Sequence, residues 1–310
     1  MTEFPSSGWK DYELLDSGAG EKLERFGAYI LARPEPKALW DRSLPEAEWR
    51  RLAHTTFTPG AGFGKAGKED SGTWNRLRKM EDQWWIRYAD PEGLTLDLRL
   101  GLTSFKHVGV FPEQAPNWDW IYRQTRALAA KGRTPRVLNL FAYTGAASLA
   151  AKAAGADVTH LDSVRQVVTW ARGNMEHSGL DGIRWIVEDA MKFAQREARR
   201  GNRYDGIILD PPAYGHGPDG EKWKLDECLF GMLRSVGAAP WPGRRESPWP
   251  AERTFAASSA TVWMAFPNRK RIPSSLPGWA GKTLQGFWKG RRGQGMGRLF
   301  SCNPCPDRSS

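Results

Sequence analysis

The sequence has few cysteines, no long apolar run and no signal peptide. Three cysteines in 310 residues are too few for the disulfide framework of a small secreted domain. A transmembrane helix needs about 18 or more consecutive apolar residues, and the chain contains no such run. Cys302 and Cys305 form one C-x-x-C without a second pair, so no metal site is predicted. We therefore expect a cytoplasmic protein without a membrane segment.

Strands and helices alternate between residues 136 and 209. Short apolar runs predict strands at 136–141, 156–162, 183–187 and 204–209. The stretches between them favour helices at 145–154, 164–177 and 190–200. Ser163 is placed to cap the second of these helices. The alternation predicts right-handed β–α–β units, and hence an α/β fold with a Rossmann-like parallel sheet covered by helices on both faces.

Glycine or carboxylates follow each of these strands, at the edge where open α/β sheets bind their ligands. The residues are Tyr143–Gly145, Asp162, Asp189 and Asp210. The single glycine excludes the G-x-G-x-x-G dinucleotide fingerprint, which disfavours an NAD oxidoreductase. Gly145 allows close approach of a ligand, Asp162 can bind two ribose hydroxyls, and Asp189 can accept from an exocyclic amine. The set suits a nucleoside without phosphates, although Asp162 or Asp189 taken singly is equally well explained as a helix cap.

The last of these strands stops at Asp210-Pro211-Pro212-Ala-Tyr214. Proline fixes its own backbone and has no N–H, so the carbonyls of this turn and the Asp210 carboxylate are acceptors in a rigid loop. Tyr214 adds an aromatic face. These features match an amino group on a planar ring, and they make Asp210, Pro211, Pro212 and Tyr214 the predicted catalytic residues. The glycine-rich stretch 215–224 is expected to form a loop that closes over the substrate.

The four motifs in this order resemble the class I S-adenosylmethionine-dependent methyltransferases, close to the bacterial branch of the 23S rRNA large-subunit methyltransferases. The resemblance covers roughly residues 10–237 and rests on Leu138–Gly145, Asp162, Glu188–Asp189, Asp210–Tyr214 and Lys106–Gln114. It implies S-adenosylmethionine as cofactor, rRNA as partner, and methyl transfer to a base nitrogen. It implies cofactor contacts from Phe111, Gln114, Phe141, Tyr143, Thr144, Gly145, Asp162, Ser163, Glu188, Asp189 and Asp210.

Residues 1–125 have a different pattern and are predicted to form a small β-rich lobe with a linking helix from about residue 118. Residues 84–88 and 94–100 alternate like half-buried strands, and Asp90–Gly93 forms the turn of a hairpin. Residues 126–238 are the predicted cofactor-binding domain. The resemblance implies that the N-terminal lobe helps to place the substrate.

Residues 239–310 form an anomalous basic tail. They hold 12 Lys and Arg against 3 Asp and Glu, so most of the net charge of +10 lies there. The tail also contains 9 prolines, 8 glycines and 5 tryptophans without a sustained period. The family architecture needs three more strands, for which Ala260–Phe266 is the best candidate. Our hypothesis is that the reading frame shifts near residue 238, so that the C-terminal strands are missing or replaced. The strand 204–209 would then lie at a sheet edge, in a fragile, aggregation-prone protein. The alternative is a disordered basic extension, against which the tryptophans argue.

Two other functions stay open. Methylation of cytosine at C5 requires a cysteine thiolate. Cys228 falls in a predicted helix, 225–236, and is expected to be a buried hydrophobe, whereas Cys302 follows Phe300-Ser in the tail, a context similar to the catalytic cysteine of such relatives. The chain is instead a catalytically impaired cofactor- or RNA-binding protein if the altered tail prevents turnover.

Overall fold

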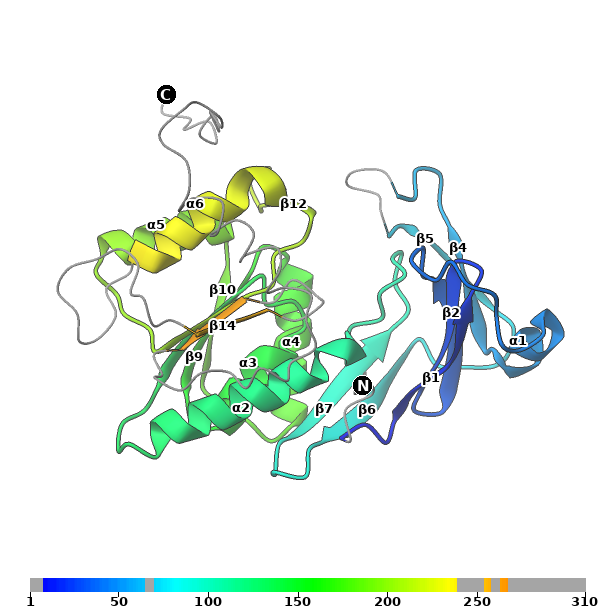
Figure 1. Ribbon diagram of the computed structural model, residues 1–310, viewed down its shortest axis with the longest axis horizontal. Helices are drawn as coiled ribbons and strands as arrows, with labels where there is room; N and C mark the ends of the chain where they lie inside the picture. Colours follow the sequence, from blue (N-terminus) through cyan, green and yellow to red (C-terminus); the bar gives the residue numbers. More distant parts are fainter. Residues whose placement is uncertain (1–7, 65–69, 239–253, 258–262, 267–310) are drawn as a thin grey trace, which may run out of the picture.

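Two sheets of different construction lie side by side in the computed structural model, which describes residues 8–64, 70–238, 254–257 and 263–266 (Figure 1). The first sheet has the order β1-β2-β3-β4-β5. Its strands are β1 (Tyr12–Gly18), β2 (Glu21–Phe26), β3 (Tyr29–Pro34), β4 (Thr55–Pro59) and β5 (Gly72–Arg76). β3 and β4 run parallel, with α1 (Glu46–Leu52) between them in the chain, and the other neighbours run antiparallel.

A buried ion pair connects this N-terminal sheet to the rest of the molecule. Arg33 on β3 donates from Nε and Nη2 to the two carboxylate oxygens of Glu24 on β2, over 2.6 and 3.1 Å. Both residues are buried, and a buried charge is tolerated only when it is paired in this way. The third guanidinium nitrogen, Nη1, donates to the Lys106 carbonyl over 3.2 Å. The pair therefore anchors the segment that precedes the second half of the chain.

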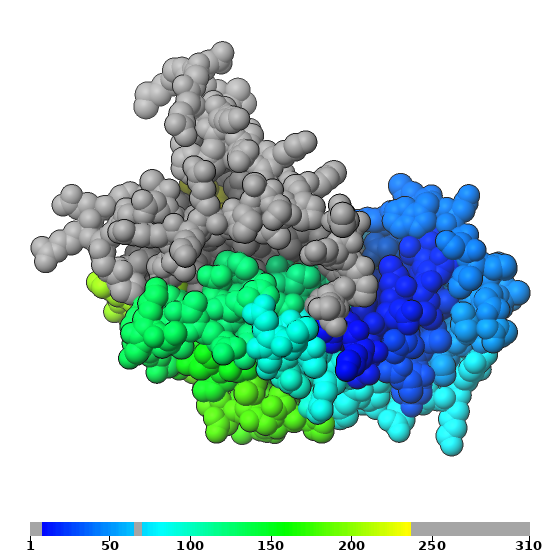
Figure 2. Space-filling model, turned by 60° about the horizontal axis from the view of Figure 1, so that its bottom comes forward, coloured from blue at the N-terminus to red at the C-terminus, as the bar shows by residue number. Residues whose placement is uncertain are grey.

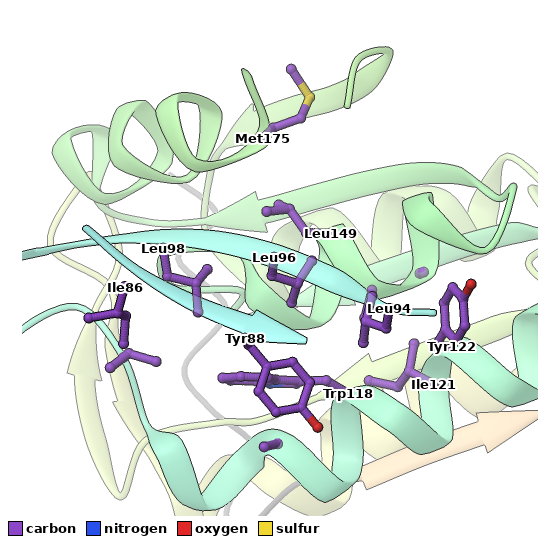
Figure 3. Close-up of a cluster of buried hydrophobic side chains, with 14 of the residues drawn as sticks. Ile86, Tyr88, Leu94, Leu96, Leu98, Trp118, Ile121, Tyr122, Leu149 and Met175 are labelled. Atoms are coloured by element: carbon purple, nitrogen blue, oxygen red, sulfur yellow. The ribbon is translucent and has the colours of Figure 1, made fainter. Parts of the chain in front are cut away.

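A β-hairpin and a long helix join the two halves. β6 (Gln83–Ala89) and β7 (Thr95–Gly101) pair antiparallel, and they are followed by the 3₁₀ turn η1 (Pro112–Gln114) and α2 (Ala115–Ala129). Alternate residues of the hairpin are buried, as their period of two predicts. Their side chains pack on Trp118 and Ile121 of α2 and on Leu149 (Figure 3). In Figure 2 the cyan hairpin lies between the blue N-terminal strands and the green half.

The second sheet has the order β10-β9-β8-β11-β15-β14. Its first four strands are parallel: β8 (Arg136–Leu140), β9 (Asp157–Asp162), β10 (Ile183–Val187) and β11 (Gly206–Leu209). The connecting helices are α3 (Ala146–Ala153), α4 (Arg165–His177), α5 (Ala190–Arg199) and α6 (Leu225–Ala238). α2 and α3 lie on one side of this sheet and α5 and α6 on the other (Figure 1). The predicted α/β fold with a parallel sheet is confirmed.

Both faces of the parallel sheet are buried. Val137 of β8 packs into the cluster with α3 and the hairpin, whereas its neighbours Leu138 and Leu140 pack against α5 and α6 on the opposite face. This is why the strands are continuous apolar runs rather than alternating ones. In register, Leu140 of β8 lies between Leu161 of β9 and Leu209 of β11. The carboxyl ends of these three strands therefore meet at one edge.

The prediction that the strand 204–209 lies at a sheet edge is wrong. β15 (Trp263–Phe266) pairs antiparallel with β11, with Ile207 opposite Ala265, and β14 (Thr254–Ala257) pairs with β15. An unpaired strand edge is costly, and the apolar run identified at Ala260–Phe266 contains the segment that satisfies it. Two strands, β15 and β14, thus lie beyond β11 in this sheet, and the expected fragility loses its structural basis. The rest of the tail, including Cys302, lies outside the described residues, and the shifted reading frame stays a hypothesis.

The predicted domain boundary at residue 125 falls inside α2, and the domain division stays a prediction. Among the described residues, no helix combines the length and the apolar character needed to cross a membrane.

Candidate active site

A pocket opens at the carboxyl ends of β8 and β11, next to η1. It encloses about 490 Å³ of space, its open mouth included. Seven of the predicted site residues line it: Phe111, Gln114, Phe141, Tyr143, Thr144, Gly145 and Asp210. Apolar walls come from Val110, Trp118, Ile121 and Ile208. A concave, largely apolar site with a few converging polar groups is typical of small-molecule binding.

The loop after β8 holds a strained backbone. Phe141 and Tyr143 have φ angles of 58° and 48°, in the left-handed region that non-glycine residues rarely adopt. Four hydrogen bonds hold the loop: Ala142 N to Leu161 O, Tyr143 N to Asp162 Oδ2, Thr144 Oγ1 to Gly109 O and Asn174 Nδ2 to Thr144 O. Strain of this kind persists only where the surroundings enforce it, and it is concentrated at functional sites.

Gly145 is required by the backbone and by packing. Its φ is 94°, and a Cβ at this position would lie 3.0 Å from the Ala171 Cβ on α4 and 3.3 Å from Leu149 Cδ1. From the sequence we expect this glycine to allow the close approach of a ligand. The structure adds that no side chain fits between the loop and α4.

Asp162, at the end of β9, holds the loop after β8 through a hydrogen bond. Its Oδ2 accepts from Tyr143 N over 2.9 Å and its Oδ1 accepts from Val164 N over 3.0 Å. Burial raises the pKa of Asp162. The predicted capping by Ser163 is wrong, because Val164 occupies the N-cap position of α4 without a side-chain cap. The Asp162 carboxylate reaches the N–H two residues ahead instead, as aspartate does in turns.

Glu188 and Asp189, the predicted adenine-side pair, are engaged within the protein and do not line the pocket. Asp189 caps α5, with its Oδ1 accepting from Lys192 N over 2.9 Å. Glu188 pairs with Arg196, with an Nη2 to Oε2 distance of 2.6 Å. A contact of either residue with an adenine ring stays a prediction.

The segment 106–114 lies over the loop, linked to it through aromatic rings. The His107 and Phe111 ring centroids are 4.9 Å apart, and those of Phe111 and Tyr143 are 5.3 Å apart. Asp70 accepts from Lys106 and His107 over 2.8 and 3.1 Å. At the pocket wall, Asn117 Nδ2 donates to Gln114 Oε1 over 2.6 Å. The N-terminal half of the chain therefore contributes directly to the pocket.

Of the four predicted catalytic residues, Asp210 alone lines the pocket. Burial, and to a smaller extent the nearby charge of Glu113, together raise the pKa of Asp210 to about 6. The side chain is therefore a carboxylate at pH 7 and becomes neutral below about pH 6. Pro211, Pro212 and Tyr214 follow it in the chain outside the lining, and Tyr214 makes an edge contact with His216.

The expected loop 215–224 is a two-stranded hairpin instead, formed by β12 (Tyr214–His216) and β13 (Lys222–Lys224). Its buried residue Trp223 was missed by the sequence argument. Trp223 Nε1 donates to the Pro212 carbonyl over 2.7 Å, and its ring lies 4.8 Å from that of Phe141. The alternation Lys-Trp-Lys in this stretch was the available signal for a strand with one buried face.

Comparison with known proteins gives the family. A family model described as S-adenosylmethionine-dependent methyltransferase matches residues 75–221. The solved structure of a SAM-dependent methyltransferase from Agrobacterium tumefaciens is 42% identical, covers 76% of this chain and 71% of its own, and has a TM-score of 0.67. The chain belongs to the S-adenosylmethionine-dependent methyltransferases. Its cofactor is S-adenosylmethionine, as the resemblance implied.

Two further comparisons concern relatives of this methyltransferase. A methyltransferase structure complexed with SAH shares the fold, with a TM-score of 0.58 and 15% identity over 84% of this chain and 75% of its own. A ribosomal RNA large subunit methyltransferase K/L from Shewanella sp. (strain ANA-3) is 29% identical over 226 residues, which are 67% of this chain and 30% of the relative. The chain thus spans less than a third of the length of the curated relatives it matches.

The pocket of this methyltransferase fits its cofactor. The left-handed loop Phe141–Gly145 and the Asp162 carboxylate behind it form a rigid wall, and Phe111 and Trp118 supply apolar surface. A nucleoside with a short charged chain needs such a combination of apolar surface and few polar groups. Asp210 lines the same pocket.

Proposed function

We propose that this methyltransferase modifies a base nitrogen of ribosomal RNA, with Asp210 as the residue that orients the acceptor. The observation that carries the proposal is the position of the Asp210 carboxylate. It lies at the end of β11, in the same pocket as the loop Phe141–Gly145, here called the cofactor loop. The curated relatives named as rRNA large subunit methyltransferases support the choice of rRNA. An rRNA acceptor would also place the protein in the cytoplasm.

The chemistry requires alignment more than acid or base strength. S-adenosylmethionine supplies a methyl group on a positively charged sulfur. The nitrogen lone pair forms the new N–C bond as the S–C bond breaks, and the bonding electrons stay on sulfur. Asp210 and the carbonyl of Pro211 would accept the N–H hydrogens, so that the lone pair faces the methyl carbon. Holding two reactants in this way accelerates a reaction by avoiding the entropy cost of encounter. The surplus proton leaves to solvent after transfer.

The Pro212 carbonyl fixes the turn rather than binding the acceptor. It already accepts from Trp223 Nε1, which leaves the Asp210 side chain and the Pro211 carbonyl for the acceptor. The bond supports a turn that is fixed before the substrate arrives. Preorganised acceptors of this kind cost no reorganisation during the reaction.

Methylation of cytosine at C5 is the weaker alternative. It needs a thiolate that reaches the ring. Cys228 lies on α6 and is 5% exposed. It packs with Leu209 and Met232 in the core between the parallel sheet and the helices α5 and α6. Cys302 lies outside the described residues.

The test is methyl transfer from radiolabelled S-adenosylmethionine to protein-free rRNA from cells that lack this gene. We expect label in rRNA, and an N-methylated base after digestion and mass spectrometry. Asp210→Ala should abolish transfer and keep the binding of S-adenosylhomocysteine measured by calorimetry. Label in 5-methylcytosine would contradict the nitrogen assignment. Cofactor binding without transfer to rRNA or tRNA would point to an impaired binding protein.

A further inference from the structure

Three buried polar side chains form a hydrogen-bonded chain beneath the cofactor loop. Asn139 on β8 donates from Nδ2 to Ser148 Oγ on α3 over 2.9 Å. Ser148 Oγ lies 3.0 Å from His160 Nδ1 on β9. Asn139 is 2% exposed, and Ser148 and His160 are 0% exposed. Asn139 also lines the pocket, so the chain leads from the pocket wall to the underside of the loop.

The contacts of His160 favour one tautomer of its imidazole. Burial lowers the pKa of His160 to about 3, so the imidazole is neutral and carries one N–H. Ser148 Oγ accepts from Asn139, and its own O–H can donate to His160 Nδ1. The imidazole proton then lies on Nε2. Within the part of the chain that the structure describes, this buried Nε2 has no hydrogen-bond partner, and a buried donor without a partner is unfavourable.

His160 lies directly against the loop. Its Cε1 is 3.5 Å from the point that a Cβ of Gly145 would occupy. The Tyr143 backbone interacts with the ring as well, and it raises the pKa of His160 against the larger opposing effect of burial. Asp162, two residues along β9, holds Tyr143 N over 2.9 Å. The amide of Tyr143 is thus fixed by Asp162, and its carbonyl is the backbone acceptor that faces the ring of His160.

We propose that His160 is a positioning residue for the cofactor: its contact with the Tyr143 carbonyl tightens into an Nε2–H hydrogen bond when the pocket is occupied, while Ser148 and Asn139 fix the tautomer. The loop is left-handed at Phe141 and Tyr143, and such a conformation persists only where its surroundings enforce it. Closing the bond removes the unfavourable donor and couples loop geometry to occupancy. The inference rests on the cofactor of the family and is independent of the acceptor.

The first experiment observes His160 in the wild-type protein by ¹⁵N NMR, without and with S-adenosylhomocysteine. We expect an Nε2-protonated ring in both states. On binding, the Hε2 resonance should move downfield and its exchange with water should slow. A proton on Nδ1, or an Hε2 that is unchanged by a saturating ligand, would overturn the proposal. This measurement needs no variant to fold.

The second experiment measures the Kd of S-adenosylhomocysteine for His160→Phe and His160→Gln by calorimetry. Phenylalanine keeps the planar ring without a donor, and we expect a Kd roughly tenfold weaker, the effect of one lost hydrogen bond. Glutamine places an N–H near the position of Nε2 and should restore part of the affinity. An unchanged Kd in a folded His160→Phe protein contradicts the proposal.

The matched control is Tyr204→Phe, which removes a buried hydroxyl next to the same sheet, 2.6 Å from Glu197 Oε2. It should lower the melting temperature and leave the Kd unchanged. A purely structural histidine would behave as this control does. Ser148→Ala combined with His160→Phe should weaken binding no more than His160→Phe alone, because both residues act through one chain. Additive losses would show that Ser148 does not act through His160.

Discussion

The indole nitrogen of Trp223 donates to the carbonyl oxygen of Pro212 over 2.7 Å, and the same ring packs against Phe141. One side chain thereby connects the loop that carries Asp210 to the loop Phe141–Gly145 after β8. The two loops follow different strands, β11 and β8, and a proline turn without its own N–H donors cannot fix its carbonyls by local bonds. Trp223 supplies the missing donor from the hairpin that follows.

Replacing Trp223 by phenylalanine should impair transfer more than binding. The variant keeps an aromatic ring against Phe141 and loses the bond to Pro212, so the acceptor site becomes less well ordered. We expect kcat to fall roughly tenfold to a hundredfold, with a Kd for S-adenosylhomocysteine close to wild type. Trp74→Phe is the control, because it removes a similar indole bond, to the Phe105 carbonyl on the N-terminal lobe. Equal losses in both variants would argue against a specific role for Trp223.

The pH dependence of kcat/KM should follow the ionisation of Asp210. Because burial raises the pKa of this carboxyl to about 6, the acceptor form is present above pH 6 and is lost as the pH falls through this value. We expect kcat/KM to decline below about pH 6 with one ionisation. In Asp210→Asn the activity should be reduced and the decline should disappear, since an amide does not titrate in this range. A profile that keeps its acid limb in Asp210→Asn would assign the limb to another group.

Gly145→Ala should damage both stability and cofactor binding. The substitution adds a methyl group 3.0 Å from Ala171 Cβ at a φ of 94°. Strain and crowding together should lower the free energy of unfolding by about 2–4 kcal/mol. Gly155→Ala separates the two causes, because Gly155 has a φ of 89° with nothing within 4 Å of its Cβ position. It should cost only about 1–2 kcal/mol. Denaturant unfolding and calorimetry measure the two effects, and equal costs would rule out crowding at Gly145.

The two roles of Asp189 can be separated by a pair of variants. Its carboxylate caps α5 through Lys192 N, and serine caps a helix nearly as well as aspartate. Asp189→Ser should therefore keep the stability, whereas Asp189→Ala should lose about 1 kcal/mol. If Asp189 also accepts from adenine, both variants should weaken the binding of S-adenosylhomocysteine. Wild-type affinity in Asp189→Ser would show that the residue is a helix cap only.

The C-terminal strand β15 is the element of the sheet that local sequence pattern supports least. The segment Trp263–Phe266 is short and lies between stretches rich in proline and glycine, so local pattern gives it little support. Its place beside β11 follows from the unpaired edge of that strand, which is a property of the whole sheet. The start of α4 is a second such case. Ser163 precedes the helix and is a common capping residue, whereas the Asp162 carboxylate reaches Val164 N only once the turn is formed.

Three features are predictable from the amino-acid sequence alone: the order of strands and helices from 136 to 209, the parallel sheet, and the set of residues at its carboxyl edge. These follow from local periodicity and from the handedness of β–α–β connections, which the chain specifies over short distances. Three others emerge only in the folded protein: Phe141 and Tyr143 adopt left-handed angles, Trp223 donates to the Pro212 carbonyl, and His160 lies against the loop after β8. Each depends on contacts between segments distant in sequence, and such contacts are fixed by packing and by the need to satisfy buried polar groups.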